Sequence, residues 1–109
     1  MGLDITIKQK RAVICPHCSE VVETRVVADT YSGGRAWYPF LERVGYYVPY
    51  DKVTPENDWY GKDMELTREQ SDYLYRYARS EECYNYHEVI SLIAMAQAEG
   101  DTVAINADW

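Results

Sequence analysis

The residues of this chain that suit metal chemistry are its three cysteines and two histidines, which form two groups along the sequence. Cys15 and Cys18 are separated by two residues, and Cys83 precedes His87 by four positions. Zn²⁺ in structural sites takes four tetrahedral ligands, and two thiolates at such a spacing reach one ion without strain. The spacing therefore predicts a structural Zn²⁺ site formed by Cys15, Cys18, Cys83 and His87. We rank His17 behind His87 as a ligand, because neighbouring residues on a tight turn usually point apart.

Two other interpretations of the same residues stay open. In the first, Cys83 is a small buried hydrophobic residue and His87 is an exposed residue of a first helical turn. In the second, the motif CPHC acts in redox chemistry, because it resembles the active-site sequence of thioredoxin-like disulfide oxidants, in which the first cysteine heads a helix that lowers its pKa. The resemblance covers these four residues only, and strand-like residues follow Cys18. It implies a thiol–disulfide oxidoreductase as an alternative function.

The segments around the first cysteine pair have the patterns of β-strands. Leu3, Ile5 and Ile7 alternate with polar residues, as in a half-buried strand. Residues 12–15 and 21–28 are rich in β-branched side chains and predict two further strands, which the CPHC turn joins as a hairpin. Residues 102–107 alternate again and predict a last strand.

Capping sequences mark where two helices begin. Thr67 and Gln70 match a capping box, and Asn85 is a second N-cap candidate before a helix over 86–99. A short helix is expected over 36–44. The order of these elements predicts an α+β fold, with a mostly antiparallel sheet of three to five strands, two C-terminal helices, a short third helix and a zinc knuckle as a staple.

Tyrosine is unusually common, with eleven tyrosines against three tryptophans and one phenylalanine. A tyrosine ring supplies apolar area together with a hydroxyl that needs a partner, so it favours half-buried positions and interfaces. Several aromatic residues lie in or just before an irregular, Asp-rich segment over 49–64, which is long for a compact domain. We read its carboxylates as a solvated loop and not as a catalytic pair. The aromatic residues predict a partner-binding surface formed by Tyr46, Tyr47, Tyr50, Trp59 and Tyr60.

A second candidate binding segment surrounds two adjacent glycines. Glycine amides and a guanidinium group can hold phosphate oxygens, and an aromatic ring can stack on a base. The residues concerned are Tyr31, Gly33, Gly34, Arg35 and Trp37. They indicate a small-ligand (nucleotide) binding or sequestering protein as another alternative, although an ordinary hairpin loop explains the same residues.

The composition narrows the class of protein and of partner. A length of 109 residues predicts one domain over 1–109. With 18 acidic against 11 basic residues, the net charge is −7, which disfavours direct nucleic-acid binding and suits a basic protein or nucleoprotein as partner. No apolar run approaches the roughly 20 residues that span a bilayer, and the N-terminal residues lack a signal-peptide pattern. We therefore expect a cytoplasmic protein that does not contact membranes.

Both ends of the chain resemble small bacteriophage-encoded proteins of unknown function. The resemblance rests on the opening Gly2-Leu-Asp-Ile5, on the helix over 85–96 and on the short strand that closes at Asp108, and it does not include the cysteines. It implies the cytoplasm of a host cell, where small acidic proteins often bind host factors. Taken with the residues above, it predicts a zinc-stabilised binding protein without enzymatic activity, which binds or inhibits a host protein of defence or nucleic-acid handling.

Overall fold

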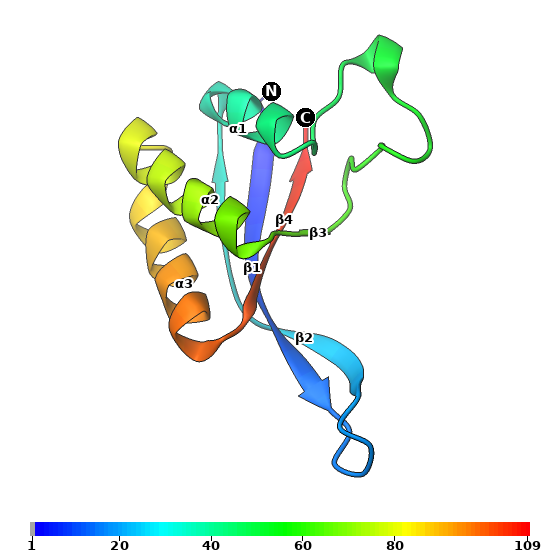
Figure 1. The fold of residues 1–109 in the computed structure, drawn as a ribbon. Helices are drawn as coiled ribbons and strands as arrows, with labels where there is room; N and C mark the ends of the chain where they lie inside the picture. The colour runs from blue at the N-terminus through cyan, green and yellow to red at the C-terminus, as the bar shows by residue number, and fades with distance from the viewer. Residues whose placement is uncertain (1) are drawn as a thin grey trace.

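The structure, a computed structural model, describes residues 2–109 and contains a four-stranded antiparallel sheet with three helices (Figure 1). The strand order across the sheet is β2-β1-β4-β3, so the last long strand lies between the first strand and a short edge strand. This arrangement confirms the α+β class and the antiparallel sheet. The elements are β1 Asp4–Ile14, β2 Val21–Gly33, α1 Tyr38–Arg43, β3 Met64–Glu65, α2 Arg68–Glu81, α3 Tyr86–Glu99 and β4 Thr102–Asp108.

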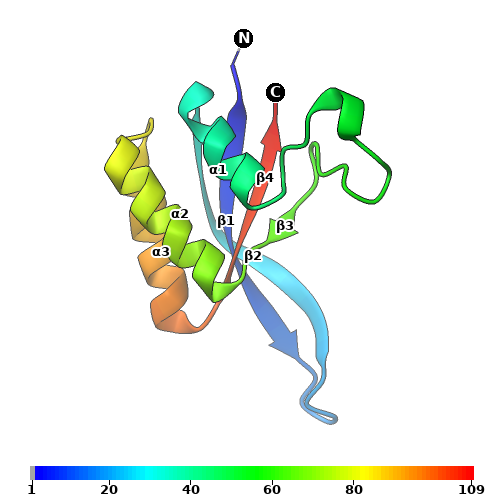
Figure 2. The same cartoon turned by 45° about the horizontal axis from the view of Figure 1, so that its top comes forward.

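The helices cover one face of the sheet, and the core lies between the two layers (Figures 1 and 2). On β1 the buried residues are every second one, which is the alternation expected of a strand with one solvated face. The buried stripe of α3 comes from residues three and four positions apart, as the sequence predicts. The core is built from Leu3, Ile5, Ile7, Trp37, Phe40, Leu41, Tyr46, Leu74, Val89, Ile93, Val103 and Ile105.

β1 is one continuous strand, whereas the sequence predicts two separate ones. The polar residues between them, Lys8 to Arg11, all find partners that are distant in sequence. Gln9 is buried and its Nε2 donates to Asp101 at 2.7 Å, while Arg11 Nη2 contacts the same carboxylate at 2.8 Å. These contacts join the middle of β1 to the end of α3, and they lower the pKa of Asp101 through the hydrogen bonds from Arg11 and Gln9.

β2 is also longer than predicted, because it continues through the segment that the paired glycines mark as a loop. Tyr31 and Ser32 pair with Thr6 and Ile5 of β1. At Gly33 an added Cβ would lie 2.8 Å from the carbonyl oxygen of Leu3, so the close strand pairing requires glycine there. The turn itself is confined to Gly34, which has φ of 107°.

Both long helices begin at the predicted residues and α3 also ends where predicted, but only α2 has a side-chain capping hydrogen bond. Thr67 Oγ1 accepts from the Gln70 amide at 3.1 Å and Gln70 Oε1 accepts from the Thr67 amide at 2.9 Å, which confirms the capping box of α2. Asn85 occupies the N-cap position of α3 as predicted, but its side chain makes no capping hydrogen bond. Asn85 has φ of 61°, and its side-chain amide donates to Thr30 Oγ1 at 3.0 Å and to the Tyr31 carbonyl at 2.9 Å. It therefore ties the start of α3 to β2.

The β1–β2 hairpin projects beyond the rest of the sheet as a two-stranded arm, defined here as residues 11–27. Pairing between β1 and β4 ends at Lys10 and Thr102, so the arm has no third strand. A register shift leaves Val27 unpaired between Ala28 and Val26 and marks where the arm begins on β2. In both views the arm extends past the helices, away from the end where the two termini lie (Figure 2).

Candidate functional site

Cys15 and Cys18 lie on the turn at the tip of the arm. The Cys15 amide donates to the Glu20 carbonyl at 2.8 Å, and the Ser19 amide donates to the Cys15 carbonyl at 2.9 Å. Ser19 has φ of 60°, so a left-handed residue closes the turn directly after the second cysteine. Hydrogen bonding lowers the pKa of the Cys15 thiol. The largest contribution comes from the Cys18 side chain, and the backbone of His17 and Cys18 contributes less. Both cysteines thus lie on one tight turn near solvent.

Cys83 and His87 lie at the other end of the molecule, so the predicted four-ligand Zn²⁺ site does not form within one chain. The Ser32 hydroxyl donates to the Tyr84 carbonyl, which places Cys83 beside the end of β2 that is remote from the tip. The eleven residue steps from Val21 to Ser32 correspond to about 35 Å of strand. The prediction of a zinc staple between the hairpin and the last helix is therefore wrong, because the length of β2 separates the two pairs of ligands.

The surroundings of Cys83 and His87 agree with the alternative interpretation, in which neither side chain binds a metal. Cys83 is 4% exposed and belongs to the core cluster, whereas His87 is exposed beside the ring of Tyr86 at 4.0 Å between centroids. Burial, followed by the charge of Glu81, raises the pKa of Cys83 to about 11. The side chain is accordingly a neutral thiol at pH 7 and packs as a small hydrophobic residue.

The thioredoxin-like alternative requires Cys15 at the start of a helix, and the structure has no helix there. Residues 15–18 form a turn and the chain continues into β2 at Val21. Since a helix N-terminus is the feature that activates the first thiol in those oxidants, this context departs from theirs. The lowered pKa of Cys15 comes instead from hydrogen bonds within the turn.

The glycine-flanked segment does not present its aromatic ring to a ligand. Trp37 is fully buried and its Nε1 donates to Ser32 Oγ at 2.9 Å, so the prediction that it stacks on a base is wrong. The Gly34 amide donates to the Leu3 carbonyl at 2.9 Å and is not free for a phosphate. Tyr31 is exposed, but it faces Tyr84 with 5.9 Å between ring centroids. Arg35 is exposed as well.

The predicted partner surface divides into buried and exposed residues. Tyr46 is buried, and its hydroxyl donates to the Lys62 carbonyl at 2.7 Å and accepts from the Ala107 amide at 2.8 Å, so its assignment to the surface is wrong. Trp59 is half-buried against the core. Tyr50 is 97% exposed and Tyr60 is 47% exposed, which suits both to contact a partner.

Trp109 completes an aromatic patch that the sequence analysis does not contain. Its ring lies edge-on to Tyr60 at 4.8 Å and to Tyr47 at 5.1 Å between centroids. These rings surround a hollow of about 570 Å³, and we call its lining the aromatic patch: Tyr47, Val48, Tyr50, Val53, Asp58, Tyr60 and Trp109. The sequence signal for this residue is its position directly after the alternating pattern of β4. Only the pairing of β4 within the sheet brings Trp109 beside the irregular segment over 49–64.

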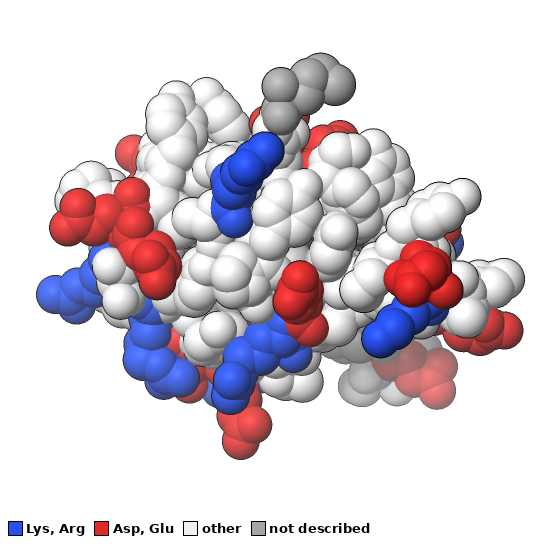
Figure 3. Space-filling model, turned by 90° about the horizontal axis from the view of Figure 1, so that it is seen from above, with Lys and Arg blue, Asp and Glu red and all other residues white. Residues whose placement is uncertain are grey.

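The surface at this end of the molecule is largely uncharged in its centre. Figure 3 looks down on the end where both termini lie, and uncharged side chains fill most of its middle. Acidic and basic side chains stand at the margins and also in the lower part of this view. A weakly charged area with exposed aromatic rings, here Tyr50 and Tyr60, is typical of a surface that binds another macromolecule.

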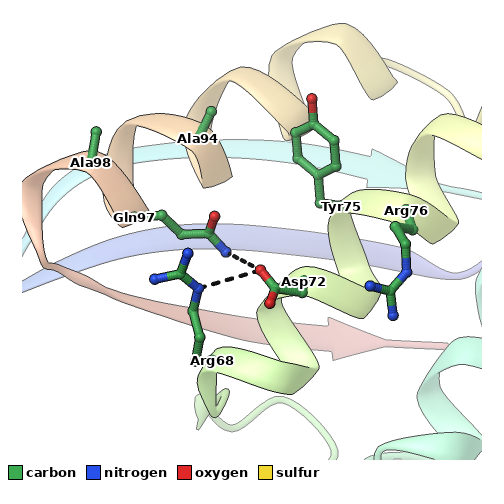
Figure 4. A pocket seen from close by; sticks show the side chains of 7 residues that line it. All are labelled: Arg68, Asp72, Tyr75, Arg76, Ala94, Gln97 and Ala98. Carbon is green, nitrogen blue, oxygen red and sulfur yellow. Dashed lines mark hydrogen bonds and ion pairs between the residues drawn. The ribbon is translucent and has the colours of Figure 1, made fainter.

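A second hollow, of about 530 Å³, lies between α2 and α3. Polar side chains that line it already hydrogen bond to one another. Asp72 Oδ1 accepts from Gln97 Nε2 at 2.8 Å and from Arg68 Nε at 3.3 Å (Figure 4). Tyr75 and Arg76 stand beside this pair on α2. We read the hollow as a groove between packed helices, in which the polar contacts join the two helices.

Asp63 lies at the end of the acidic segment, but it is not a solvated loop residue. Its carboxylate contacts Lys8 Nζ at 2.9 Å and Lys10 Nζ at 2.7 Å, and it accepts from Asn106 Nδ2 at 2.7 Å. Burial acts to raise the pKa of Asp63, but the bonds from Lys10, Asn106 and Lys8 outweigh it and hold the pKa well below its usual range. Asp63 thus neutralises the two lysines on the solvated face of β1.

Replacing Asp63 by asparagine is expected to lower the free energy of unfolding at pH 7 by about 2 kcal/mol, because two half-buried lysines lose their counter-charge. A carboxyl with a lowered folded-state pKa stabilises the fold above its unfolded pKa of about 4, and this stabilisation is lost as pH falls through the folded value. Urea unfolding should therefore show a smaller difference from the parent chain at pH 3 than at pH 7. The exposed Asp51→Asn is the control, and an equal loss at both pH values contradicts the charge-based explanation.

Comparisons of the chain with protein-family models, with curated proteins and with solved structures find no match. Within residues 2–109, no helix has both the length and the apolar character that crossing a bilayer requires.

Proposed function

We propose that this chain is a non-enzymatic binding protein whose aromatic patch receives a basic segment of a partner protein. The observation that carries the proposal is the set of exposed rings around the hollow, with Tyr50 and Tyr60 at its edge and Trp109 within it. In line with the resemblance to bacteriophage proteins, the concrete form of the proposal is inhibition of a host protein of defence or nucleic-acid handling.

The rings of Tyr47, Tyr60 and Trp109 are held in place by contacts with one another before a partner arrives. The Tyr60 hydroxyl donates to the Trp109 carbonyl at 3.3 Å, and Trp109 also packs edge-on against the buried Tyr46 at 6.1 Å between centroids. Aromatic side chains with few rotatable bonds lose little entropy on binding, so they are common as the dominant contacts of interfaces. Their arrangement supports a role as anchors.

The charge of the patch favours a cationic partner. Asp58 lines the hollow, and the exposed Asp51 and Glu56 belong to the same segment. A lysine or arginine that enters the hollow would meet ring faces and a carboxylate together, which is the setting of a cation–π contact. The net charge of −7 also attracts a basic partner over longer distances. The partner that this chemistry fits is a protein segment rich in lysine or arginine.

The test is affinity capture from host lysate with the immobilised chain, followed by the same capture with Tyr50→Ala combined with Tyr60→Ala. A partner bound by the patch should be lost from the double variant by tenfold or more, since two interface anchors contribute at least 1.4 kcal/mol together. Capture should also weaken with Asp58→Asn and at high salt.

The matched control is Tyr31→Ala, which removes an exposed tyrosine outside the patch. Circular dichroism should show that all variants keep the fold. The proposal is contradicted when the double variant captures the same protein as strongly as the parent chain, or when the Tyr31 variant loses it equally.

A further inference from the structure

The tip of the arm presents half of a zinc coordination sphere. Backbone hydrogen bonds from Ser19 to Cys15 and from Cys15 to Glu20 close a tight turn that carries both Cys15 and Cys18, and Cys18 is exposed to solvent. Tetrahedral Zn²⁺ needs four ligands, and two thiolates on one turn supply two of them. The other predicted pair, Cys83 and His87, lies beyond the far end of β2 and cannot supply the rest. Within residues 2–109, no group of three or more His, Cys, Asp or Glu side chains is arranged to hold a metal.

The arm also has an apolar face that its own chain leaves uncovered. Val26 pairs with Lys10 and Val21 pairs with Ile14, so Val26, Val21 and Ile14 lie on the face of the ribbon turned away from the helices. Val21 is 58% exposed, and Ile14 and Val26 are each about half exposed. An isolated two-stranded ribbon is only marginally stable in water. A second layer on this face would stabilise the arm.

The distribution of charge makes the arm the place where two copies of the chain can approach. The arm carries Arg11 and Arg25 against Glu20 and Glu23, and therefore no net charge. The acidic excess of the chain lies in the rest of the molecule. Contact between tips keeps the two acidic bodies apart by more than the Debye length of about 8 Å at physiological salt, which limits their repulsion.

We propose that two copies of this chain share one Zn²⁺ ion, which is bound by Cys15 and Cys18 of each copy at the tips of their arms. The second copy is the occupant that the geometry fits, because a two-fold axis through the metal turns one pair of thiolates into four. Each of the four thiols releases its proton to solvent when it binds the metal. The exposed residues next to the tip, Ile14 and Val21, then lie near those of the other copy.

A zinc-linked dimer would present two aromatic patches facing away from each other, because the patch lies at the end opposite the arm (Figure 1). Two patches in one particle raise the apparent affinity for a partner that carries two matching segments. The clasp itself does not depend on the proposed function. Its residues and those of the patch are separate, so the two proposals can fail independently.

The test measures zinc content and mass of the full chain, purified with a thiol reductant and then exposed to Zn²⁺ alone. Native mass spectrometry and light scattering should find twice the chain mass of 12.7 kDa with one zinc ion per two chains. A chelator should return the protein to a zinc-free monomer. Replacing the zinc with Co²⁺ should give the visible absorption of tetrahedral, thiolate-bound cobalt.

Cys15→Ser and Cys18→Ser should each abolish both the dimer and the bound zinc, with no loss of fold because both residues lie at the tip of the arm. His87→Ala is the matched control and should retain both properties, since it replaces an exposed residue of the discarded ligand set. Three outcomes overturn the clasp: one zinc ion per monomer without a dimer, no zinc bound, or a dimer that resists chelator and is separated by reductant.

Discussion

Replacing Tyr46 by alanine is expected to lower the free energy of unfolding by about 4 kcal/mol, because a fully buried aromatic ring leaves a cavity in the core. For a chain of this length, such a loss corresponds to a melting temperature lower by about 20 °C. The effect is large since Tyr46 joins segments that are far apart in sequence. Its hydroxyl contacts the Lys62 carbonyl and both backbone groups of Ala107, and its ring packs on Trp59 and Trp109.

The Tyr46→Phe variant separates the contribution of the hydroxyl to stability from that of the ring. This variant keeps most of the packing and leaves the Ala107 amide without its acceptor, so we expect a loss of about 2 kcal/mol. Hydrogen exchange should speed up at Gly61, whose amide donates to the Ala107 carbonyl at 2.9 Å. Tyr50→Ala is the control, with a change within about 0.5 kcal/mol because the side chain is exposed. A Tyr46→Ala variant as stable as this control contradicts the core role of Tyr46.

Trp37→Ala is expected to lower the free energy of unfolding by a similar amount, about 4 kcal/mol. The indole is fully buried and packs edge-on against Phe40 at 5.7 Å and obliquely against Tyr77 at 5.7 Å between ring centroids. Its Nε1 donates to Ser32 Oγ, which in turn donates to the Tyr84 carbonyl. The side chain therefore connects α1, α2 and the end of β2. Thermal and urea unfolding followed by circular dichroism measure the loss.

Trp37→Phe keeps a ring in the cavity and removes the indole N–H, so its expected cost is smaller, at about 2 kcal/mol. Tyr31→Ala is the matched control, because Tyr31 lies in the same candidate ligand segment but is exposed. A nucleotide that raises the melting temperature of the parent chain and of Tyr31→Ala equally would show that Tyr31 does not hold it. If Trp37→Ala is as stable as the control, the assignment of Trp37 to the core is incorrect.

The local elements of the fold could be predicted from the sequence because their signals lie within a few residues. The capping box at Thr67 gives the start of α2, and the sequence pattern over 86–99 gives both bounds of α3. Alternation predicts the faces of β1 and β4. The turn at Cys15 to Cys18 follows from a spacing that suits two thiols on one knuckle.

Other features depend on partners that are distant along the chain. In the sequence, Lys8 and Gln9 interrupt the apolar pattern of a strand. In the folded chain, Asp63 and Asp101 lie beside them and supply their partners. Asn85 occupies the N-cap position of α3, but its side-chain amide donates to Thr30 and Tyr31 on β2 instead of capping the helix. Exposed and buried tyrosines likewise have the same local sequence character, so Tyr46 could not be told apart from Tyr47 before the core was assembled.

The sequence by itself determined the class of the fold, the positions of the helices and the presence of a two-thiol turn, since each follows from side-chain periodicity or short-range spacing. Only the tertiary structure decided which ligands and which rings come together. The reason is that strand pairing sets distances between segments, and β2 places Cys15 and Cys83 at opposite ends of the molecule. The same pairing brings Trp109 to Tyr60 and creates the aromatic patch.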